Sequence, residues 1–413
     1  MGFKKAILIL FTVIAAAPFY GCGEAEKEVP VIPLSIWGNE YNTELLTEIV
    51  NEFNSEHSSE VKLDCTISVQ SESSCRSIVL SSPENAADIF AFADDQLSEL
   101  ADAGALLENT YDPDRIIAEV GGPDSAAGSL ITRNGKVYAY PQTAGNGYFL
   151  YYNKKYFSEK DIERLDSILR ISEENEKKFT MDFTAGWYLY SFFRGAGLEL
   201  SATPDGLSNI CNWNAQDTLF TGADVAESLL KISDSKGFVS LNDEGFVKAV
   251  QDGTVIAGVN GAWNSDVVSK AWGDDFAAAM LPSYTIKNEQ KQMYSFCGYK
   301  LLGINAHTRE PDWCRKLASY ITNEENQLKL YRITGECPAS VKAASSEEVK
   351  NSPVVNAISA QSEFSTIQNV SEAFWDASNR FGIIISGGNK DGKNIQELLD
   401  NMVNGITAIQ SGE

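Results

Sequence analysis

The chain has 413 residues, 43% of them hydrophobic and 22% charged, so it is long enough to bury one large core or two ordinary ones. Lysines and arginines number 33 against 57 aspartates and glutamates, giving a formal net charge of −24. Such an acidic surface repels phosphate backbones and argues against a nucleic-acid partner. The two histidines, His57 and His307, are too few for a histidine-based metal site or a Ser-His-Asp triad, so we expect neither metal nor cofactor.

The N-terminus has the features of a secretion signal. Lys4 and Lys5 precede the apolar run AILILFTVIAAAPFY, and GCG follows at 21–23, so residues 1–21 are predicted to be a signal peptide. With Cys22 directly after Gly21, this site resembles the lipobox of bacterial lipoproteins, whose cysteine is diacylated. The alternative is an ordinary signal followed by an incidental cysteine. We expect a lipid anchor on Cys22, a polar tether over 22–30, and a location on the extracytoplasmic face of the bacterial cell membrane.

Six further cysteines follow Cys22, and an exported protein with an even number of cysteines has the option of forming disulfides. They are Cys65, Cys75, Cys211, Cys297, Cys314 and Cys337. Cys65 alternates in phase with Leu63 and Ile67, which is typical of an ordinary core position in a strand. If a bridge forms, Cys65–Cys75 is the pair that we predict. The chain contains no CxxC, which argues against a zinc knuckle.

The spacing of apolar residues switches repeatedly between the period of a strand and that of a helix. Strands are predicted at 34–37, 61–69, 87–93, 136–141, 148–153, 179–183, 255–263, 276–284 and 300–306. Helices are predicted at 42–58, with Asn42 as the cap, and at 95–107, 161–178, 186–197, 224–237, 243–253 and over most of the chain after 306. This alternation predicts α/β layers, and the chain length favours two lobes over a single sheet.

Catalytic signatures find little support. Asp94 and Asp95 stand side by side at the end of a predicted strand, where neighbouring side chains point to opposite faces. Such a pair does not flank one glycosidic bond at the separation that a glycosidase needs, and strand-end polar residues or a helix cap explain it better. No G-x-S-x-G, Walker A or G-x-G-x-x-G motif is present. We therefore expect no enzyme.

Aromatic residues recur beside small or polar residues at predicted strand ends, turns and helix starts. They are Trp37, Phe92, Trp187, Trp263 and Trp375. Open α/β sheets bind ligands beyond the carboxyl ends of their strands. Flat aromatic faces next to Asn, Asp and Glu suit sugars, which present apolar C–H faces ringed by hydroxyls. Any one of these residues alone is equally well explained as core, but the set favours a sugar site.

The segment KVYAYPQTAGNGYFLYYNK, at 136–154, places two strand-like runs around the insert QTAGNG. A β-hairpin is one explanation, because the aromatic alternation of both runs fits paired strands. The chain, however, completes one βα set before 141 and starts another after 148. Two glycines and Asn146 give the insert the backbone freedom of a hinge between lobes.

Five motifs resemble the extracellular solute-binding proteins of ABC sugar importers, specifically the maltose/maltodextrin-binding family. They are NGKVYAYP…YFLYYNK (134–154), AVQDGTVIAGVNGAW (249–263), MLPSY (280–284), LLGINA (301–306) and EAFWDAS (372–378), in the family's order and spacing. The similarity runs from about residue 31 to 413. In that family the first of these segments crosses between lobes, which favours the hinge over the hairpin.

The resemblance implies a two-lobed, type II periplasmic-binding-protein fold that closes on an oligosaccharide and delivers it to membrane permease subunits. A malto-oligosaccharide is the expected ligand. Lobe one is expected at 31–143 and 302–351, and lobe two at 147–299 and 353–413. The hinge is expected near 141–147, 299–302 and 351–353. A monomer is expected. The alternatives are a xylo-, manno- or galacto-type oligosaccharide on the same fold, a lipid-anchored glycan-degrading enzyme, and a purely structural surface lipoprotein.

The resemblance also implies site residues, carried over motif by motif. Trp263 and Trp375 match stacking tryptophans of the second lobe, and Trp187, followed by Tyr188, falls where the family has a stacking aromatic residue. Phe92 and Asp95 match an aromatic residue and a hydroxyl-binding carboxylate of the first lobe, with Phe in place of Trp implying weaker stacking. Asn39 and Glu40 lie in the first strand–helix loop, which also contacts sugar in the family. With Trp37 from the aromatic pattern, the full expected set is Trp37, Asn39, Glu40, Phe92, Asp95, Asn146, Trp187, Tyr188, Trp263 and Trp375. Gly145 and Asn146 replace an acidic side chain of the family, and we expect Asn146 to bond sugar instead.

Overall fold

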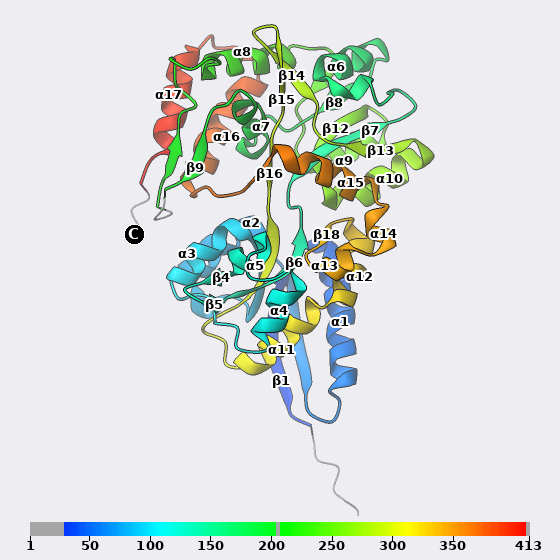
Figure 1. Cartoon of the computed structure of the whole chain (residues 1–413), viewed down its shortest axis with the longest axis vertical. Coiled ribbons are helices and arrows are strands. Elements are labelled where there is room, and N and C mark those ends of the chain that lie inside the picture. Colours follow the sequence, from blue (N-terminus) through cyan, green and yellow to red (C-terminus); the bar gives the residue numbers. More distant parts are fainter. Residues whose placement is uncertain (1–28, 204–206, 410–413) are drawn as a thin grey trace, which may run out of the picture.

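The computed structural model describes residues 29–203 and 207–409, which form two lobes, each built around its own sheet (Figure 1). The predicted signal peptide and the predicted lipidation at Cys22 lie outside the described residues. Two separate groups of buried apolar side chains fill lobe two and one fills lobe one. Each lobe therefore has its own core.

Lobe one contains a six-stranded sheet whose order is β18-β6-β17-β3-β1-β2. The strands are β1 (Val31–Gly38), β2 (Lys62–Val69), β3 (Ile89–Ala93), β6 (Ala139–Ala144), β17 (Tyr299–Ile304) and β18 (Cys337–Pro338). Strands β1, β2 and β3 are parallel, and β17 runs antiparallel to β3 and β6. The helices are α1 (Thr43–Glu56), α2 (Glu72–Ser81), α3 (Leu97–Asp102), α4 (Pro113–Glu119), α5 (Ala126–Ile131), α11 (Pro311–Ile321), α12 (Glu324–Thr334), α13 (Val341–Ala344) and α14 (Glu347–Lys350), with a short ladder of β4 (Thr132–Arg133) and β5 (Lys136–Val137).

Lobe two contains a five-stranded sheet whose order is β11-β8-β12-β7-β13. The strands are β7 (Tyr148–Asn153), β8 (Lys178–Thr180), β11 (Phe238–Val239), β12 (Val255–Gly261) and β13 (Phe276–Ala279). The helices are α6 (Leu165–Glu174), α7 (Gly186–Gly195), α8 (Gly222–Ser233), α9 (Asp243–Gln251), α10 (Ser265–Trp272), α15 (Pro353–Gln361), α16 (Ala373–Ser386) and α17 (Ile395–Ile406). Three small two-stranded ladders complete it: β9 (Leu200–Ala202) with β10 (Asn209–Cys211), β14 (Ser283–Ile286) with β15 (Glu289–Gln292), and β16 (Ser295–Cys297) with β19 (Ser365–Ile367).

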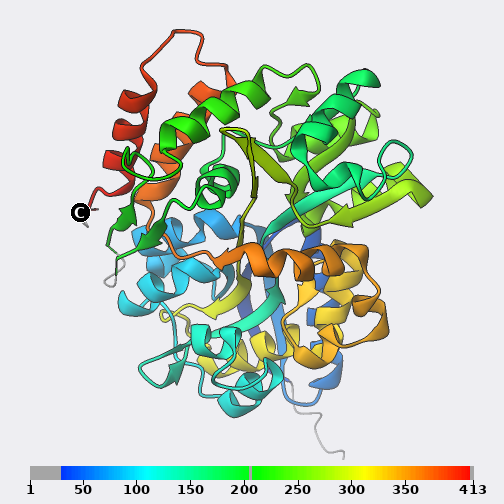
Figure 2. The ribbon, with the colours of Figure 1, turned by 45° about the horizontal axis from the view of Figure 1, so that its top comes forward.

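The chain crosses from one lobe to the other three times. The crossings are at 145–147 between β6 and β7, at Gly298 between β16 and β17, and at 351–352 between α14 and α15. Figure 2 shows α15, in orange, lying where the lobes meet. Backbone N–H of Asn146 donates to the carbonyl of Gly298 at 2.9 Å, so two of the crossings are bonded to each other. Gly145 has a φ of +75°, which favours glycine. The second crossing precedes β17, whose first residue is Tyr299.

Several elements differ from the sequence prediction. The strand expected at 276–284 is two strands, β13 and β14, and the β14–β15 hairpin was not foreseen because its turn residues, Lys287 and Asn288, adopt positive φ without a glycine. The helix expected at 161–178 ends at Glu174, and Glu176 has a φ of +55°. Asn42 occupies the N-cap position of α1, but its side chain makes no capping hydrogen bond.

The predicted Cys65–Cys75 disulfide is not formed, because both residues are free thiols. Cys65, on β2, shares its electrostatic surroundings with Cys314 and Asp88, whereas Cys75, on α2, lies near Glu72. Burial raises the pKa of each of the two thiols to about 12, so both stay protonated. The thiols thus face different parts of lobe one and behave as small apolar side chains.

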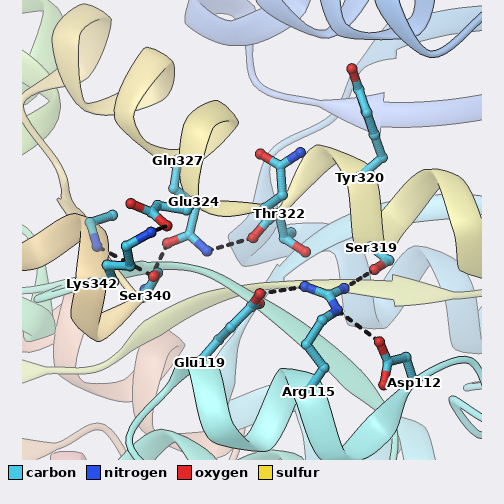
Figure 3. A network of polar contacts seen from close by, with 12 residues as sticks. Asp112, Arg115, Glu119, Ser319, Tyr320, Thr322, Glu324, Gln327, Ser340 and Lys342 are labelled. Atoms are coloured by element: carbon cyan, nitrogen blue, oxygen red, sulfur yellow. Dashed lines mark hydrogen bonds and ion pairs between the residues drawn. The ribbon is translucent and has the colours of Figure 1, made fainter. Parts of the chain in front are cut away.

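A polar network fixes α12 within lobe one (Figure 3). The buried side chain of Gln327 donates to the carbonyl of Thr322 at 2.6 Å and accepts from the N–H of Ser340 at 2.8 Å. Nearby, Lys342 pairs with Glu324 at 2.7 Å on the surface. The buried amide therefore ties the end of α11 and the start of α13 to α12.

Two negative findings apply to residues 29–203 and 207–409. Within them, no helix has the length and apolar character needed to cross a membrane. The same residues contain no group of three or more His, Cys, Asp or Glu side chains placed to hold a metal ion.

Candidate binding site

A cavity of about 600 Å³ lies between the lobes, at the carboxyl ends of β1, β2, β3 and β12. Lobe one contributes Asn39, Tyr41, Ser71, Glu72, Arg76, Ala93, Asp95, Gln96 and Lys300; lobe two contributes Trp187, Asp243, Trp263, Gln368, Glu372, Trp375 and Asn379; and Asn146 comes from the first crossing. Loops that follow strand ends meet here because strands of one direction end at the same sheet edge. The volume is typical of a small-molecule site.

Lobe two provides the aromatic surface of the cavity. Trp187 lies in the first turn of α7, Trp375 in the first turn of α16, and Trp263 in the turn after β12. The rings of Trp187 and Trp263 are stacked, with centroids 5.7 Å apart and planes 25° apart. Gly186 permits the close approach of α7 to α16, since a Cβ there would lie 1.8 Å from the hydroxyl of Ser378. All three tryptophans are partly exposed and line the cavity, so part of each ring remains accessible.

Asp243 fixes the ring of Trp263. Its Oδ2 accepts from the indole Nε1 of Trp263 at 2.9 Å, and its Oδ1 accepts from the amides of Asn260 and Asn264 at 2.9 and 3.1 Å. Asp243 is the first residue of α9, directly after the N-cap Asn242. A carboxylate with three donors holds the indole in one orientation.

Lobe one provides a polar network around Lys300. The Nζ of Lys300 donates to Tyr41 Oη at 2.8 Å, pairs with Glu336, and lies 5.4 Å from the ring centroid of Trp263. Burial alone would lower the pKa of Lys300, but the charges of Glu336 and Glu72 outweigh burial and raise its pKa above the usual value. Lys300 therefore stays charged, and a cation–π contact joins it to the tryptophan of the other lobe.

Two further polar contacts join the lobes at the cavity. Gln368 Nε2 donates to Asp95 Oδ2 at 2.8 Å, and Arg76 forms an ion pair with Glu372. Burial raises the pKa of Asp95 to about 6, although the Gln368 hydrogen bond and the charge of Arg76 lower it in part. The described conformation therefore has lobes in direct contact across the cavity.

The structure brings six of the ten predicted site residues to the cavity: Asn39, Asp95, Asn146, Trp187, Trp263 and Trp375. Of the other four, Phe92 is fully buried in the core of lobe one, because every residue of β3 is covered on both faces. Tyr188 belongs to the core of lobe two, with its ring 4.9 Å from that of Tyr148. Trp37 packs beside Phe90, and Glu40 lies exposed outside the lining. The buried rings of Phe92 and Tyr188 have no face to offer a ligand in this conformation, whereas Trp37 is partly exposed but lies outside the lining.

Asp94 and Asp95 lie in one 3₁₀ turn after β3 and not within a strand. Asp94 accepts from the N–H of Tyr299 at 3.0 Å, beside the second crossing, while Asp95 faces Gln368 of lobe two. The two carboxylates thus hold different structural positions, and they do not flank a common bond.

Sequence reasoning missed much of the charged and polar lining: Tyr41, Glu72, Arg76, Asp243, Lys300, Gln368 and Glu372. Lys300 carried a usable signal, since it is a charged residue that precedes the apolar run LLGI at the expected second crossing. Arg76 and Glu72 carried none, because polar residues on a short helix are typical of a solvated face.

Comparison with known proteins identifies relatives. The model of the family described as bacterial extracellular solute-binding proteins matches residues 48–357. A maltooligosaccharide ABC transporter solute-binding lipoprotein of Streptococcus pneumoniae is 27% identical over 65% of this chain and 66% of its own length, so the match spans just under two thirds of that relative. The galactooligosaccharide-binding protein of Bacillus subtilis is 22% identical over 99% of both chains. The structure of a maltodextrin-binding protein of L. casei BL23 without ligand is 25% identical, with a TM-score of 0.73 over 91% of this chain and 98% of that one.

Proposed function

The chain belongs to the bacterial extracellular solute-binding proteins and has a two-lobed, type II periplasmic-binding fold, and from this premise we propose that it captures a neutral oligosaccharide between its lobes. Like the other members of this family, it is a binding component and not an enzyme. One observation carries the proposal: three partly exposed tryptophans of lobe two face carboxylates and amides of lobe one across a single cavity. Indole faces fit the C–H faces of sugar rings, and the polar groups fit their hydroxyls.

Asp95 and Trp187 add support at the level of single atoms. Asp95 Oδ1 and Trp187 Nε1 are buried and have no hydrogen-bond partner within 29–203 and 207–409. Buried polar atoms are normally paired, and sugar hydroxyls both donate and accept. We assign Asp95 as an acceptor of a sugar hydroxyl, Trp187 as a donor to one, and Asn39 and Asn146 as further hydrogen-bonding groups.

Binding is coupled to lobe closure in this account. A sugar that touches both lobes binds the closed form better than the open form, so it shifts the population toward closure. We assign the hinge to 145–147, Gly298 and 351–352, with the lobe boundaries that these crossings imply. Arg76–Glu372 and Asp95–Gln368 are contacts that form only when the lobes meet.

A malto-oligosaccharide is the cargo that we favour, because two of the relatives are named for maltooligosaccharide or maltodextrin. A galacto-type oligosaccharide is the second candidate, because the relative that aligns along the whole chain is named for it. The lining contains four carboxylates, Glu72, Asp95, Asp243 and Glu372, against two cations, which disfavours acidic sugars.

A thermal-unfolding panel tests the proposal. The purified protein is melted with maltose to maltoheptaose and with xylo-, manno- and galacto-oligosaccharides. A ligand that binds the native state alone raises the melting temperature by mass action, in proportion to its occupancy. A rise confined to α-glucans supports the malto assignment, a rise with another series corrects the cargo, and no rise with any sugar contradicts oligosaccharide capture.

We also propose that Cys22 carries a lipid anchor and that the closed, loaded protein docks on permease subunits of an ABC transporter. The support is the GCG sequence after the apolar N-terminal run and a relative named as a lipoprotein. Replacing Cys22 by Ala is expected to move the protein from the membrane fraction of expressing cells to the soluble or medium fraction. Retention of the Cys22→Ala protein in the membrane would contradict the anchor.

A further inference from the structure

A second cavity lies between the lobes and shares part of its wall with the first. It has a volume of about 580 Å³, and its lining includes Asp94, Asp95, Ser129, Ser201, Phe296 and Gln368. Asp95 and Gln368 line both cavities. The second cavity is therefore as large as the first and adjoins it at this one pair.

The partition between the cavities is a contact between the lobes. Gln368 Nε2 donates to Asp95 Oδ2 at 2.8 Å. Gln368 moves with lobe two, because it follows β19 and its N–H donates to the carbonyl of Cys297 at 2.9 Å. Asp95 moves with lobe one, because it directly follows β3. Any parting of the lobes removes the partition, and the two cavities then form one continuous groove.

Two acidic side chains in the lining of the second cavity are incompletely hydrogen-bonded within the described residues. Asp94 Oδ1 and Asp95 Oδ1 are both buried and without a hydrogen-bond partner in the part of the chain that the structure describes. Asp94 itself is only 4% exposed. Apolar side chains, Leu200 and Phe296 among them, lie beside these acids. A surface of carboxylate oxygens and apolar groups suits neutral sugar units, which supply hydroxyl donors and C–H faces.

We propose that the second cavity is an accessory binding region that takes the further units of a long, neutral oligosaccharide. The oligosaccharide passes Asp95, and one of the sugar hydroxyls replaces the amide of Gln368 as the hydrogen-bond donor to the Asp95 carboxylate. The inference rests on the proposed function, because it extends the same sugar chain. Short oligosaccharides fill the first cavity alone, and the partition then stays closed beside them.

Bulky substitutions that fill only the second cavity test the inference. Ser129, on α5, and Ser201, on β9, are exposed and line the second cavity but not the first. Ser129→Trp and Ser201→Trp are compared with Ser55→Trp, an equally exposed change on α1 that lines neither cavity. Calorimetric titration with maltotriose and with maltoheptaose, or with the same lengths of whichever series the melting panel selects, gives the dissociation constants. Melting temperatures verify that each variant is folded.

The expected result is a selective loss for the long ligand. Both cavity variants should bind maltoheptaose about fivefold or more weakly and bind maltotriose with unchanged affinity, while Ser55→Trp matches the wild type for both. If folded variants bound both lengths as the wild type does, or lost both equally, the accessory region would be refuted while the proposed function stood. If the wild type bound no oligosaccharide of any length, both would fall.

Discussion

Trp263 combines a partly exposed ring with a fixed indole nitrogen. Its face lies against Trp187 and Lys300, and its Nε1 is held by Asp243, which is itself held by two asparagines. A preorganised aromatic side chain loses little conformational entropy on binding, so it contributes more affinity than a mobile one. We therefore regard Trp263 as the anchor of the site.

Replacing Trp263 by Ala should weaken oligosaccharide binding by about tenfold or more, because central aromatic anchors dominate such interfaces. Calorimetric titration measures the change. Trp313→Ala is the matched control, since Trp313 is also partly buried but packs against the core of lobe one, outside the cavity. It should lower the melting temperature and leave affinity alone. Unchanged affinity in the Trp263 variant would refute the assignment of this residue.

Asp95 should make stability depend on pH in a defined direction. Its pKa in the folded protein is about 6, against 3.8 for an ordinary aspartate, so the native state holds a proton that the unfolded state has released between these values. The free energy of unfolding contributed by Asp95 is therefore highest below pH 4, falls as pH rises toward 6, and is constant above that.

Urea unfolding of the wild type and of Asp95→Asn from pH 4 to 7 measures this contribution together with its coupling to Asp94. The difference in unfolding free energy between the two proteins should shift in favour of Asp95→Asn as pH rises from 4 to 6. Burial, and next the charge of Asp95, raise the pKa of the neighbouring Asp94, so Asp95→Asn also removes the part of the Asp94 contribution that depends on Asp95. Parallel curves for the two proteins would show that Asp95 is not buried in the way described.

At the scale of elements, the crossing between β6 and β7 depends on backbone positions. Gly145 has a φ of +75°, and a Cβ there would lie 2.9 Å from Ile358 of α15. Gly104 has a similar φ, +69°, but no atom within 4 Å of an added Cβ. Substitutions at both glycines strain the backbone in the same way, but only a substitution at Gly145 also makes a close contact at the hinge.

Gly145→Ala and Gly104→Ala should each cost about 1–2 kcal/mol of stability, because an L-residue is disfavoured in the left-handed region. The Gly145 variant should lose more, since Ile358 must shift, and it alone should change sugar affinity by about threefold or more through the balance of open and closed forms. Denaturant unfolding and titration of both variants measure these effects. Equal behaviour of the two variants would argue against a hinge at 145–147.

The amide network of α12 gives a second test at this scale. Gln327→Leu keeps the volume but leaves the buried carbonyl of Thr322 and N–H of Ser340 unpaired, which should cost about 2–4 kcal/mol. Lys342→Ala, which removes an exposed ion pair in the same region (Figure 3), should have little effect. Chemical denaturation compares the unfolding free energies of the two variants. A small loss of stability in Gln327→Leu would show that water satisfies the carbonyl of Thr322 and the N–H of Ser340.

The elements also show what the sequence was able to predict. Long periodic segments such as α1 and β2 were predicted because burial of one face imposes a regular pattern. The β14–β15 hairpin was missed because Lys287 and Asn288 carry no standard turn signal, and the single strand expected at 276–284 was an error of the same kind. Phe92 and Tyr188 were predicted as site residues, but tertiary packing, to which a local motif is blind, buries both of them. Trp37, predicted from the aromatic pattern, is partly buried against the core of lobe one and does not line the cavity.

At the scale of the whole molecule, the predicted family and fold class are confirmed by the comparisons. Family motifs made that prediction possible, because five of them stand in order along the chain. The charged lining of the cavity, including Arg76, Glu72 and Asp243, was not predictable, since it assembles from residues distant in sequence that meet only when the lobes do. The lobe boundaries and the lipid anchor remain predictions.

Calorimetric titration of the wild-type protein with the best oligosaccharide of the melting panel, at two temperatures, tests the central claim most directly. Capture in one cavity between closing lobes predicts saturable binding of one ligand per chain and a negative heat-capacity change, because apolar surface of tryptophans and lobes is buried on closure. Absence of saturable binding, or a stoichiometry other than one, would contradict capture of an oligosaccharide between the lobes.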